Sequence, residues 1–174
     1  AKPYENRDPR LKASIYYDGS KLNLETGALL STKTGGNCAL DPSNARYTCT
    51  GYYTRKFSHY KSGRSGNLDG YFKEFRLAEL YLNYAEAANE ASTTGTVPND
   101  AVDAVNAVRS RVGMPGIPYG LSCDQFRLRI RNERRVELAF EEHRFFDVRR
   151  WKMLDQTDKV ITGMKANSDG SYSR

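Results

Sequence analysis

Five side chains near residue 140 have the types that acid–base or metal chemistry uses: Glu133, Glu137, Glu141, Glu142 and His143. A di-iron centre in a helix bundle uses Glu-x-x-His, but the residue three before His143 is Phe140. Glycoside hydrolysis needs two carboxylates that face each other across a cleft. Glu133 and Glu137 instead lie one above the other along one predicted helix. We therefore interpret these acids as structural.

Other catalytic signatures are absent from the sequence. The segment Gly63-Arg64-Ser65-Gly66 lacks the G-x-S-x-G spacing of a nucleophile elbow, and no phosphate-binding loop is found. His59 and His143 are the only two histidines, so few Ser–His or Cys–His arrangements can form. Cysteines and histidines do not cluster with metal-ligand spacing. We expect no enzymatic reaction, no catalytic residue, no cofactor and no metal site.

The acidic helix is predicted to begin near Ser122 or Asp124 and to run to about Phe140 or Phe146. Glu133 and Glu137 fall on the same face as its apolar side chains, where an unpaired charge is strongly disfavoured. Nearby arginines are the expected partners. The sequence therefore predicts a structural ion-pair network of Glu133, Glu137, Arg134, Arg144, Arg149 and Arg150.

Two further helices precede this one. Residues 71–91 are apolar on nearly all sides, so this helix is expected to be covered by neighbours on both faces. Residues 101–112 carry small apolar side chains at helical spacing, and Gly113 and Pro115 end the pattern. The fold class is therefore mainly α, built from helical hairpins of the TPR type. We place a domain boundary near Gly70, with a helical region over 71–174.

Residues 1–70 are rich in loops and short strands. Residues 13–17 form one strand candidate, which ends at the turn Asp18-Gly19, and residues 52–57 form another. Residues 60–70 are expected to be an exposed loop. Cys38 and Cys49 flank a turn-rich segment. A disulfide between them and a pair of free thiols are both compatible with this spacing.

The net charge of +6 first suggests a nucleic-acid partner. Between Phe126 and Lys152, however, nine basic residues alternate with five acidic ones, and Arg127, Arg131 and Arg135 line one helix face. The tyrosine-rich loops lie elsewhere in the sequence, so the combination of stacking rings and phosphate-binding cations is missing. We expect no nucleic-acid partner.

Several motifs, taken in order, resemble the SusD/RagB family. They are residues 8–11 (DPRL), 50–57 (TGYYTRKF), 75–87 (FRLAELYLNYAEA), 104–113 (AVNAVRSRVG), 130–141 (IRNERRVELAFE) and 144–151 (RFFDVRRW). The match covers nearly the whole chain, and several motifs in order are more specific than any one. Two departures are Val112, where alanine is usual, and Glu142-His143, where a glycine is common.

This resemblance implies a TPR-like helical fold with irregular and β segments inserted on one face, and upstream N-terminal helices that lie outside this chain. Family members are lipoproteins on the outer-membrane surface. They capture oligosaccharides or polysaccharides for a TonB-dependent transporter and catalyse no reaction. The resemblance implies that membrane association comes from a lipid anchor outside this chain. Part of the glycan-binding face is also expected on sequence outside the chain.

The family does not fix its ligand residues by motif, so the candidates come from sugar chemistry. The C–H face of a sugar packs on an exposed aromatic ring, and its hydroxyl groups need donors and acceptors. The loop tyrosines Tyr16, Tyr17, Tyr47 and Tyr60 are therefore the candidate glycan-binding residues. The alternative function is a TPR-like protein–protein interaction module that binds no sugar.

Overall fold

The chain folds into two compact units in the computed structural model, which describes residues 2–22, 26–41, 43–44, 47–58, 73–157 and 159–174. The first unit comprises residues 1–7, 11–72 and 154–174, and the second comprises residues 8–10 and 73–153. The sequence predicted one boundary near Gly70. The structure differs in two places, because 154–174 belongs to the first unit and 8–10 to the second.

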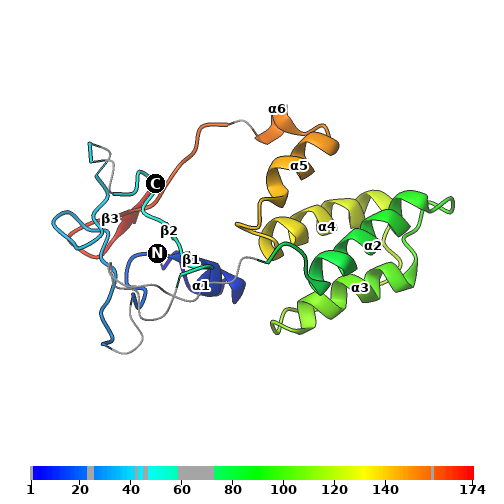
Figure 1. Ribbon diagram of the computed structural model, residues 1–174, viewed down its shortest axis with the longest axis horizontal. Helices are drawn as coiled ribbons and strands as arrows, with labels where there is room; N and C mark the ends of the chain where they lie inside the picture. Colours follow the sequence, from blue (N-terminus) through cyan, green and yellow to red (C-terminus); the bar gives the residue numbers. More distant parts are fainter. Residues whose placement is uncertain (1, 23–25, 42, 45–46, 59–72, 158) are drawn as a thin grey trace. The chain divides into compact units, whose positions relative to one another are not determined.

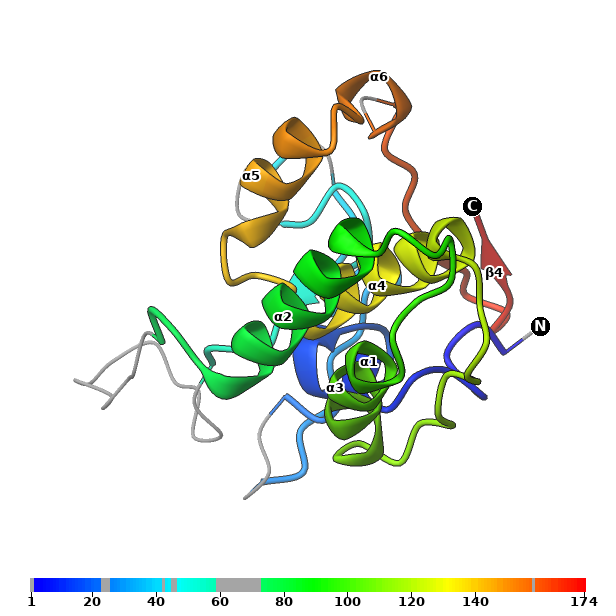
Figure 2. The ribbon, with the colours of Figure 1, turned by 90° about the vertical axis from the view of Figure 1, so that its right-hand side faces the viewer.

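The second unit is helical, which agrees with the predicted fold class. Its helices are α2 (Leu77–Ala91), α3 (Asn99–Ser110), α4 (Cys123–Glu137) and α5 (His143–Arg150). Helix α2 packs against both α3 and α4 (Figures 1 and 2). The buried apolar side chains between these helices form one core, which includes Leu82, Ala85, Val102, Val105, Val108, Phe126 and Ile130.

The starts of the helices follow their local sequence. Ser122 caps α4 with a capping box, since its hydroxyl accepts from the N–H of Gln125 and the Gln125 side chain accepts from the N–H of Ser122. Helix α3 begins at Asn99, close to the predicted start. Helix α2 begins at Leu77 rather than at residue 71, because Arg76 is extended, with φ −150° and ψ 159°.

The third helix was predicted to end at about Phe140 or Phe146. Helix α4 ends at Glu137, close to the first of these, whereas the second extends across a break into α5. Phe140 and Glu142 adopt left-handed φ values of 64° and 65°, which turn the chain between α4 and α5. A left-handed conformation costs about 1–2 kcal/mol for a residue with a side chain. No glycine or proline marks this break in the sequence, so helical periodicity alone extended the prediction across it.

Helix α2 carries apolar side chains on two faces, but the described part of the chain covers only one. Leu82 and Ala85 are buried, whereas Leu77, Leu80 and Tyr84 are 61%, 50% and 46% exposed. These exposed residues recur at helical spacing and form one continuous stripe. The sequence predicted neighbours on both faces of this helix, and the described residues supply them on one.

The first unit holds short elements: α1 (Arg10–Ser14) from Leu11 onward, β1 (Ile15–Tyr16), β2 (Tyr53–Thr54), α6 (Leu154–Thr157), β3 (Lys165–Ala166) and β4 (Tyr172–Ser173). Strands β1 and β2 pair antiparallel, with Tyr16 opposite Tyr53, and β3 pairs antiparallel with β4. Both strand candidates from residues 1–70 therefore contain a strand, and the structure pairs them.

Two glycines fix the C-terminal segment within the first unit. A Cβ atom at Gly51 would lie 2.1 Å from the carbonyl oxygen of Met164, and one at Gly163 would lie 2.3 Å from that of Thr50. The N–H of Met164 donates to the carbonyl of Thr50 at 2.8 Å. Backbone meets backbone here, so both positions require glycine.

The cysteines are relevant to the possible disulfide, and the lengths of the helices are relevant to membrane insertion. Cys38, Cys49 and Cys123 are free thiols in the structure, so Cys38 and Cys49 do not form the disulfide that their spacing allowed. Burial raises the pKa of the Cys38 thiol. None of the helices described here is long and apolar enough to cross a membrane.

Candidate functional site

Glu133 is buried on α4 and bound by two arginines. Its side chain accepts from Arg10 Nη1 at 2.5 Å and from Arg109 Nη1 at 2.6 Å, and the residue is 1% exposed. Each carboxylate oxygen therefore receives a charge-assisted hydrogen bond. Burial without these partners would be strongly unfavourable for a charged acid.

Glu137, one turn further along α4, is bound by three arginines. Arg76 Nη1 donates to its Oε1 at 2.7 Å, Arg111 Nη2 donates to Oε1 at 2.8 Å, and Arg10 Nη1 donates to Oε2 at 2.9 Å. Burial by itself would raise the pKa of Glu137. The hydrogen bonds from Arg76 and Arg10 outweigh that effect and lower its pKa, so this acid stays ionised at neutral pH.

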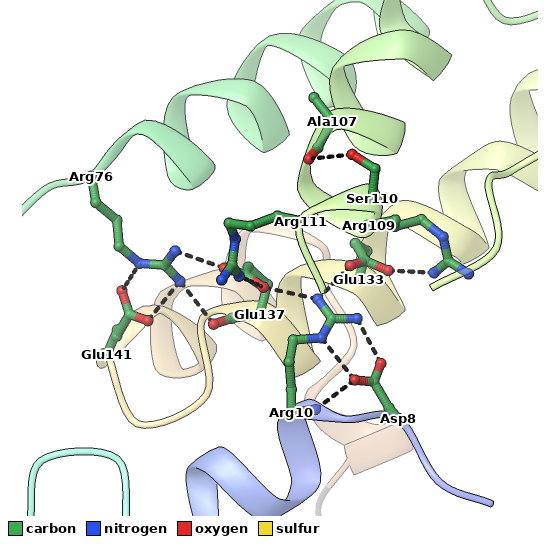
Figure 3. A network of polar contacts seen from close by, with 10 residues as sticks. All are labelled: Asp8, Arg10, Arg76, Ala107, Arg109, Ser110, Arg111, Glu133, Glu137 and Glu141. Carbon is green, nitrogen blue, oxygen red and sulfur yellow. Dashed lines mark hydrogen bonds and ion pairs between the residues drawn. The ribbon is translucent and has the colours of Figure 1, made fainter. Parts of the chain in front are cut away.

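Arg10 joins the two glutamates to a third acid. Its Nε and Nη2 bind Asp8 at 2.9 and 2.6 Å, while its Nη1 bridges Glu133 and Glu137 (Figure 3). Arg10 is 6% exposed. The hydrogen bond from Arg10 lowers the pKa of Asp8. This one guanidinium therefore connects residues 8–10 to the core of the helical unit.

Arg76 gives the network a second bridge. It forms a two-pronged pair with Glu141, with Nε and Nη2 at 2.7 and 2.8 Å from the two carboxylate oxygens, and it also binds Glu137 (Figure 3). Glu141 follows α4 and lies next to Phe140, where the chain turns. The pairing with Arg76 therefore ties the start of α2 to the turn between α4 and α5.

The arginines on the two glutamates differ from those expected from the sequence. Arg134 points to α5, where it binds Asp147 at 3.1 Å. Arg150 binds Asp147 at 2.8 Å and also Glu86. The Arg149 guanidinium lies over the Phe145 ring, and Arg144, near Arg135, has a pKa lowered by burial and by that neighbouring charge. Arg134 follows Glu133 directly on α4 and therefore points about 100° around the helix from it. The other three arginines lie on α5, beyond the left-handed turn at Phe140 and Glu142.

The true partners are Arg10, Arg76, Arg109 and Arg111. Each lies far from the glutamates in sequence, so proximity along the chain could not find them. The sequence did contain one indication of these partners, because all four arginines lie in motifs that resemble the family. Arg10 lies in DPRL, Arg76 in RLAE, and Arg109 and Arg111 in VRSRVG. Arginines that lie in such motifs and have no other assigned role were therefore better candidates for ion pairs with the buried acids than arginines chosen by proximity along the chain.

This arrangement serves as a scaffold. A general acid or base must exchange protons with substrate, but Glu133 and Glu137 are buried and each is ion-paired with at least two arginines. Within the described residues, no group of three or more histidine, cysteine, aspartate or glutamate side chains is placed to hold a metal ion. The acids that first suggested chemistry therefore hold helices and the 8–10 segment together.

The tyrosine candidates fall in different environments in the first unit. Tyr16 is buried, its hydroxyl lies 3.0 Å from Ser58 Oγ, and the Arg55 guanidinium sits 5.2 Å from the centre of its ring. Its ring packs inside the unit because residue 16 faces inward on β1, unlike the exposed ring expected. Tyr17 and Tyr47 are half-buried. Tyr60 lies outside the described residues.

Tyr17 belongs to a cluster that the sequence did not reveal. Its ring stacks on Tyr4 with centroids 4.0 Å apart and planes at 23°. Tyr52 and Tyr172 meet the Tyr4 ring edge-on, at 6.3 and 5.4 Å. All four residues are half-buried. We call these four residues the tyrosine cluster.

An acid borders the tyrosine cluster. The Tyr172 hydroxyl donates to Asp18 Oδ2 at 3.2 Å, and the N–H of Thr32 donates to Asp18 Oδ1 at 2.9 Å. Burial, followed by the neighbouring phenols and Asp18, raises the pKa of Tyr4 well above its usual range. Burial and Asp18 also raise the pKa of Tyr172. Both phenols therefore keep their protons at neutral pH.

Tyr4, Tyr52 and Tyr172 were missed because they come from separate parts of the chain. Tyr4 lies near the N-terminus, Tyr52 follows Gly51, and Tyr172 begins β4. Only the folded chain brings them to Tyr17. The close approach at Gly51 and Met164, which joins the segments leading to Tyr52 and Tyr172, had no sequence signal beyond the glycines themselves.

Comparison with known proteins decides the family. The model of the SusD family matches residues 1–173. This chain belongs to the SusD family. The SusD-like proteins P25 and P2 of Formosa agariphila are 40% and 39% identical to it over 83 and 85 residues. Those matches cover 46% and 45% of this chain and 15% and 16% of the two relatives.

Solved structures agree with the SusD family assignment. A SusD-like protein from Bacteroides fragilis is 34% identical, with a TM-score of 0.83 over 98% of this chain. A laminarin-binding SusD-like protein is 28% identical, with a TM-score of 0.53 over 90% of this chain. This chain spans 33% and 32% of those two proteins. SusD-like proteins are known as binding proteins rather than enzymes and are associated with the outer membrane.

Proposed function

We propose that this SusD-family chain takes part in non-enzymatic capture of glycans at the bacterial outer-membrane surface. The captured oligosaccharide or polysaccharide would pass to a TonB-dependent transporter, and a lipid anchor outside this chain would hold the protein at the membrane. The family match over residues 1–173 carries the proposal, and a related protein binds laminarin.

The distribution of polar groups supports binding rather than catalysis. The buried carboxylates of α4, Glu133 and Glu137, are each ion-paired with two or more arginines. The partly exposed aromatic rings of the tyrosine cluster lie in the first unit, beside a carboxylate that accepts hydrogen bonds. Rings together with acceptors are what sugar recognition requires.

The alternative is a protein-interaction module, and one observation favours it. The stripe of Leu77, Leu80 and Tyr84 on α2 is exposed, and an apolar stripe of this kind is typical of a helix that another protein segment covers. The stripe lies in the helical unit, whereas the tyrosine cluster lies in the first unit. The two candidate functions therefore use different surfaces and can be tested separately.

A glycan array probed with the protein tests the proposed function, together with a pull-down for an outer-membrane transporter. We expect selective binding of an oligosaccharide class, with a dissociation constant of roughly micromolar to millimolar. Release of free reducing ends from the bound glycan would contradict a non-enzymatic role. Retention of a protein partner with no glycan bound at millimolar concentration would favour the interaction module instead.

A further inference from the structure

We propose that the stack of Tyr4 and Tyr17, with Asp18 beside it, is a binding site for an uncharged oligosaccharide. This inference rests on the proposed function and adds to it a location and a ligand class. Tyr16 is buried, so it is no longer a candidate for ring stacking with a sugar. The candidate is instead the pair of Tyr4 and Tyr17, which the fold brings together from two separate segments.

The rings are held in place before any ligand arrives. The turn after β1 is closed by hydrogen bonds from the Ser20 N–H to the Tyr17 carbonyl at 2.9 Å and from the Tyr17 N–H to Ser20 Oγ at 3.0 Å. The Gly19 N–H donates to the Leu30 carbonyl at 2.8 Å. A preorganised aromatic surface loses little conformational entropy on binding, which favours affinity.

Asp18 has acceptor capacity left for sugar hydroxyls. An ionised carboxylate offers about four lone-pair sites. Asp18 accepts from the Thr32 N–H and hydroxyl on Oδ1 and from the Tyr172 hydroxyl on Oδ2. Adjacent hydroxyls of a pyranose can therefore donate to this carboxylate while the C–H face of the ring covers an aromatic ring.

The charge at the site decides the ligand class. The net charge of +6 for the whole chain would attract an anionic glycan from a distance. Such long-range attraction is screened beyond about 8 Å at physiological ionic strength. Asp18 is in hydrogen-bond contact with the tyrosine cluster, so its negative charge acts at short range and opposes a uronate or a sulfate there.

The protonated phenols fit the same ligand class. Because burial and Asp18 raise the pKa of Tyr172, its hydroxyl is a donor at neutral pH, as is that of Tyr4. The Tyr172 proton is donated to Asp18, so the phenol oxygen and the carboxylate together present acceptors to the hydroxyl groups of a sugar. Neither group carries a positive charge, which fits an uncharged sugar better than a uronate or a sulfate.

The test is titration calorimetry of the protein with two probes, a laminarin oligosaccharide, which is uncharged, and an alginate oligosaccharide, which carries uronates. We expect the uncharged probe to bind at least tenfold more tightly. Tyr17→Ala should weaken its binding about tenfold or more, because an aromatic face is lost. Tyr17→Phe keeps the ring and should bind within about threefold of the original protein.

Matched controls separate the site from the fold. Tyr119→Ala removes an exposed tyrosine of the helical unit and should leave binding unchanged. Asp18→Asn should weaken the uncharged probe several-fold and reduce its preference over the uronate probe, because the opposing charge is gone. The near-ultraviolet dichroism of the tyrosines reports whether each variant keeps its structure. For the unmodified protein, shifts of tyrosine ring signals on sugar addition provide a measurement that needs no variant.

The outcomes are distinct. Unchanged binding in a folded Tyr17→Ala variant, or no shift of tyrosine ring signals in the unmodified protein, would overturn this location while leaving glycan capture intact. Tighter binding of the alginate probe would overturn the ligand class. Absence of binding to every glycan on the array would refute the proposed function itself, and with it this site.

Discussion

Replacement of Arg10 by methionine should destabilise the helical unit by about 3 kcal/mol. Methionine keeps much of the length of the arginine stem but removes the guanidinium. Arg10 contacts Asp8, Glu133 and Glu137, and it is 6% exposed. Removal of one partner from a buried ion pair typically costs about 3–5 kcal/mol, because the remaining charge stays buried without compensation.

The structure places the expected value at the lower end of that range. Glu133 keeps its bond to Arg109, and Glu137 keeps those to Arg76 and Arg111. Neither acid is left alone, so the variant should still fold. With a denaturant dependence of about 2 kcal/mol per molar urea, the unfolding midpoint should fall by about 1.5 M.

Trp151 provides the assay. It is the only tryptophan of the chain, it lies in the helical unit, and its Nε1 donates to Glu86 on α2 at 2.6 Å. Its fluorescence during urea unfolding therefore reports on this unit. The matched control is Arg127→Met on α4, which removes a partly exposed arginine bound to Glu90 and Asp124. Exposed ion pairs contribute about 0–1 kcal/mol, so the control should unfold near the original midpoint.

A double-mutant cycle identifies the cause. Glu133→Gln removes one of the charges that Arg10→Met leaves undercompensated. The double variant should therefore be more stable than the sum of the two single losses predicts, by at least about 1 kcal/mol. If Arg10→Met lowered stability no more than Arg127→Met does, the network would not be the scaffold that we describe.

Three further predictions concern acid, backbone strain and backbone contact. The pKa of Glu137 is lowered on folding, so its contribution to stability is present above the unfolded value of about 4.3 and is lost as pH falls through the folded pKa. The urea midpoint should therefore fall as the pH is lowered below about 4, and it should fall less steeply in Glu137→Gln. An equal dependence of the midpoint on pH in the two proteins would contradict this. Glu142→Gly should raise the free energy of unfolding, followed by Trp151 fluorescence, by up to about 1 kcal/mol, because glycine relieves a left-handed φ at some entropic cost. A lower free energy of unfolding would show that contacts of the Glu142 side chain matter more. Gly163→Ala should destabilise the first unit by about 1–3 kcal/mol and so make it more sensitive to protease. Gly116→Ala, where an added Cβ would meet its neighbours at 3.4 Å, should be tolerated. Equal protease sensitivity of the two variants would argue against the close approach of Gly163 to Thr50.

The spacing of apolar residues predicted the helices well, but it could not predict contacts between residues that are far apart in the sequence. The cores of α2, α3 and α4 follow apolar spacing that a single sequence displays, and the predicted start of α4 near Ser122 or Asp124 agrees with the N-cap at Ser122. The turn at Phe140 and Glu142 was missed because neither residue is one that usually signals a left-handed conformation.

The candidate site was predicted in part for the same reason. The sequence indicated that Glu133 and Glu137 need arginine partners, because an apolar helix face cannot hold an unpaired charge. Which arginines bind them depends on how residues 8–10, 76 and 109–111 meet α4, and only tertiary structure determines that. Tyr17 was a candidate from the sequence, but its stacking partner Tyr4 is not detectable without the fold.

The placement of residues 8–10 matters for any attempt to dissect this protein. Those residues belong to the helical unit, although chain belonging to the other unit precedes and follows them. A recombinant fragment that started at residue 73 would contain Glu133 and Glu137 but would lack Arg10, whose guanidinium binds both of them. Expression of the helices alone should therefore give a weakened product, and a short synthetic peptide that spans Asp8 to Arg10 should restore it in trans.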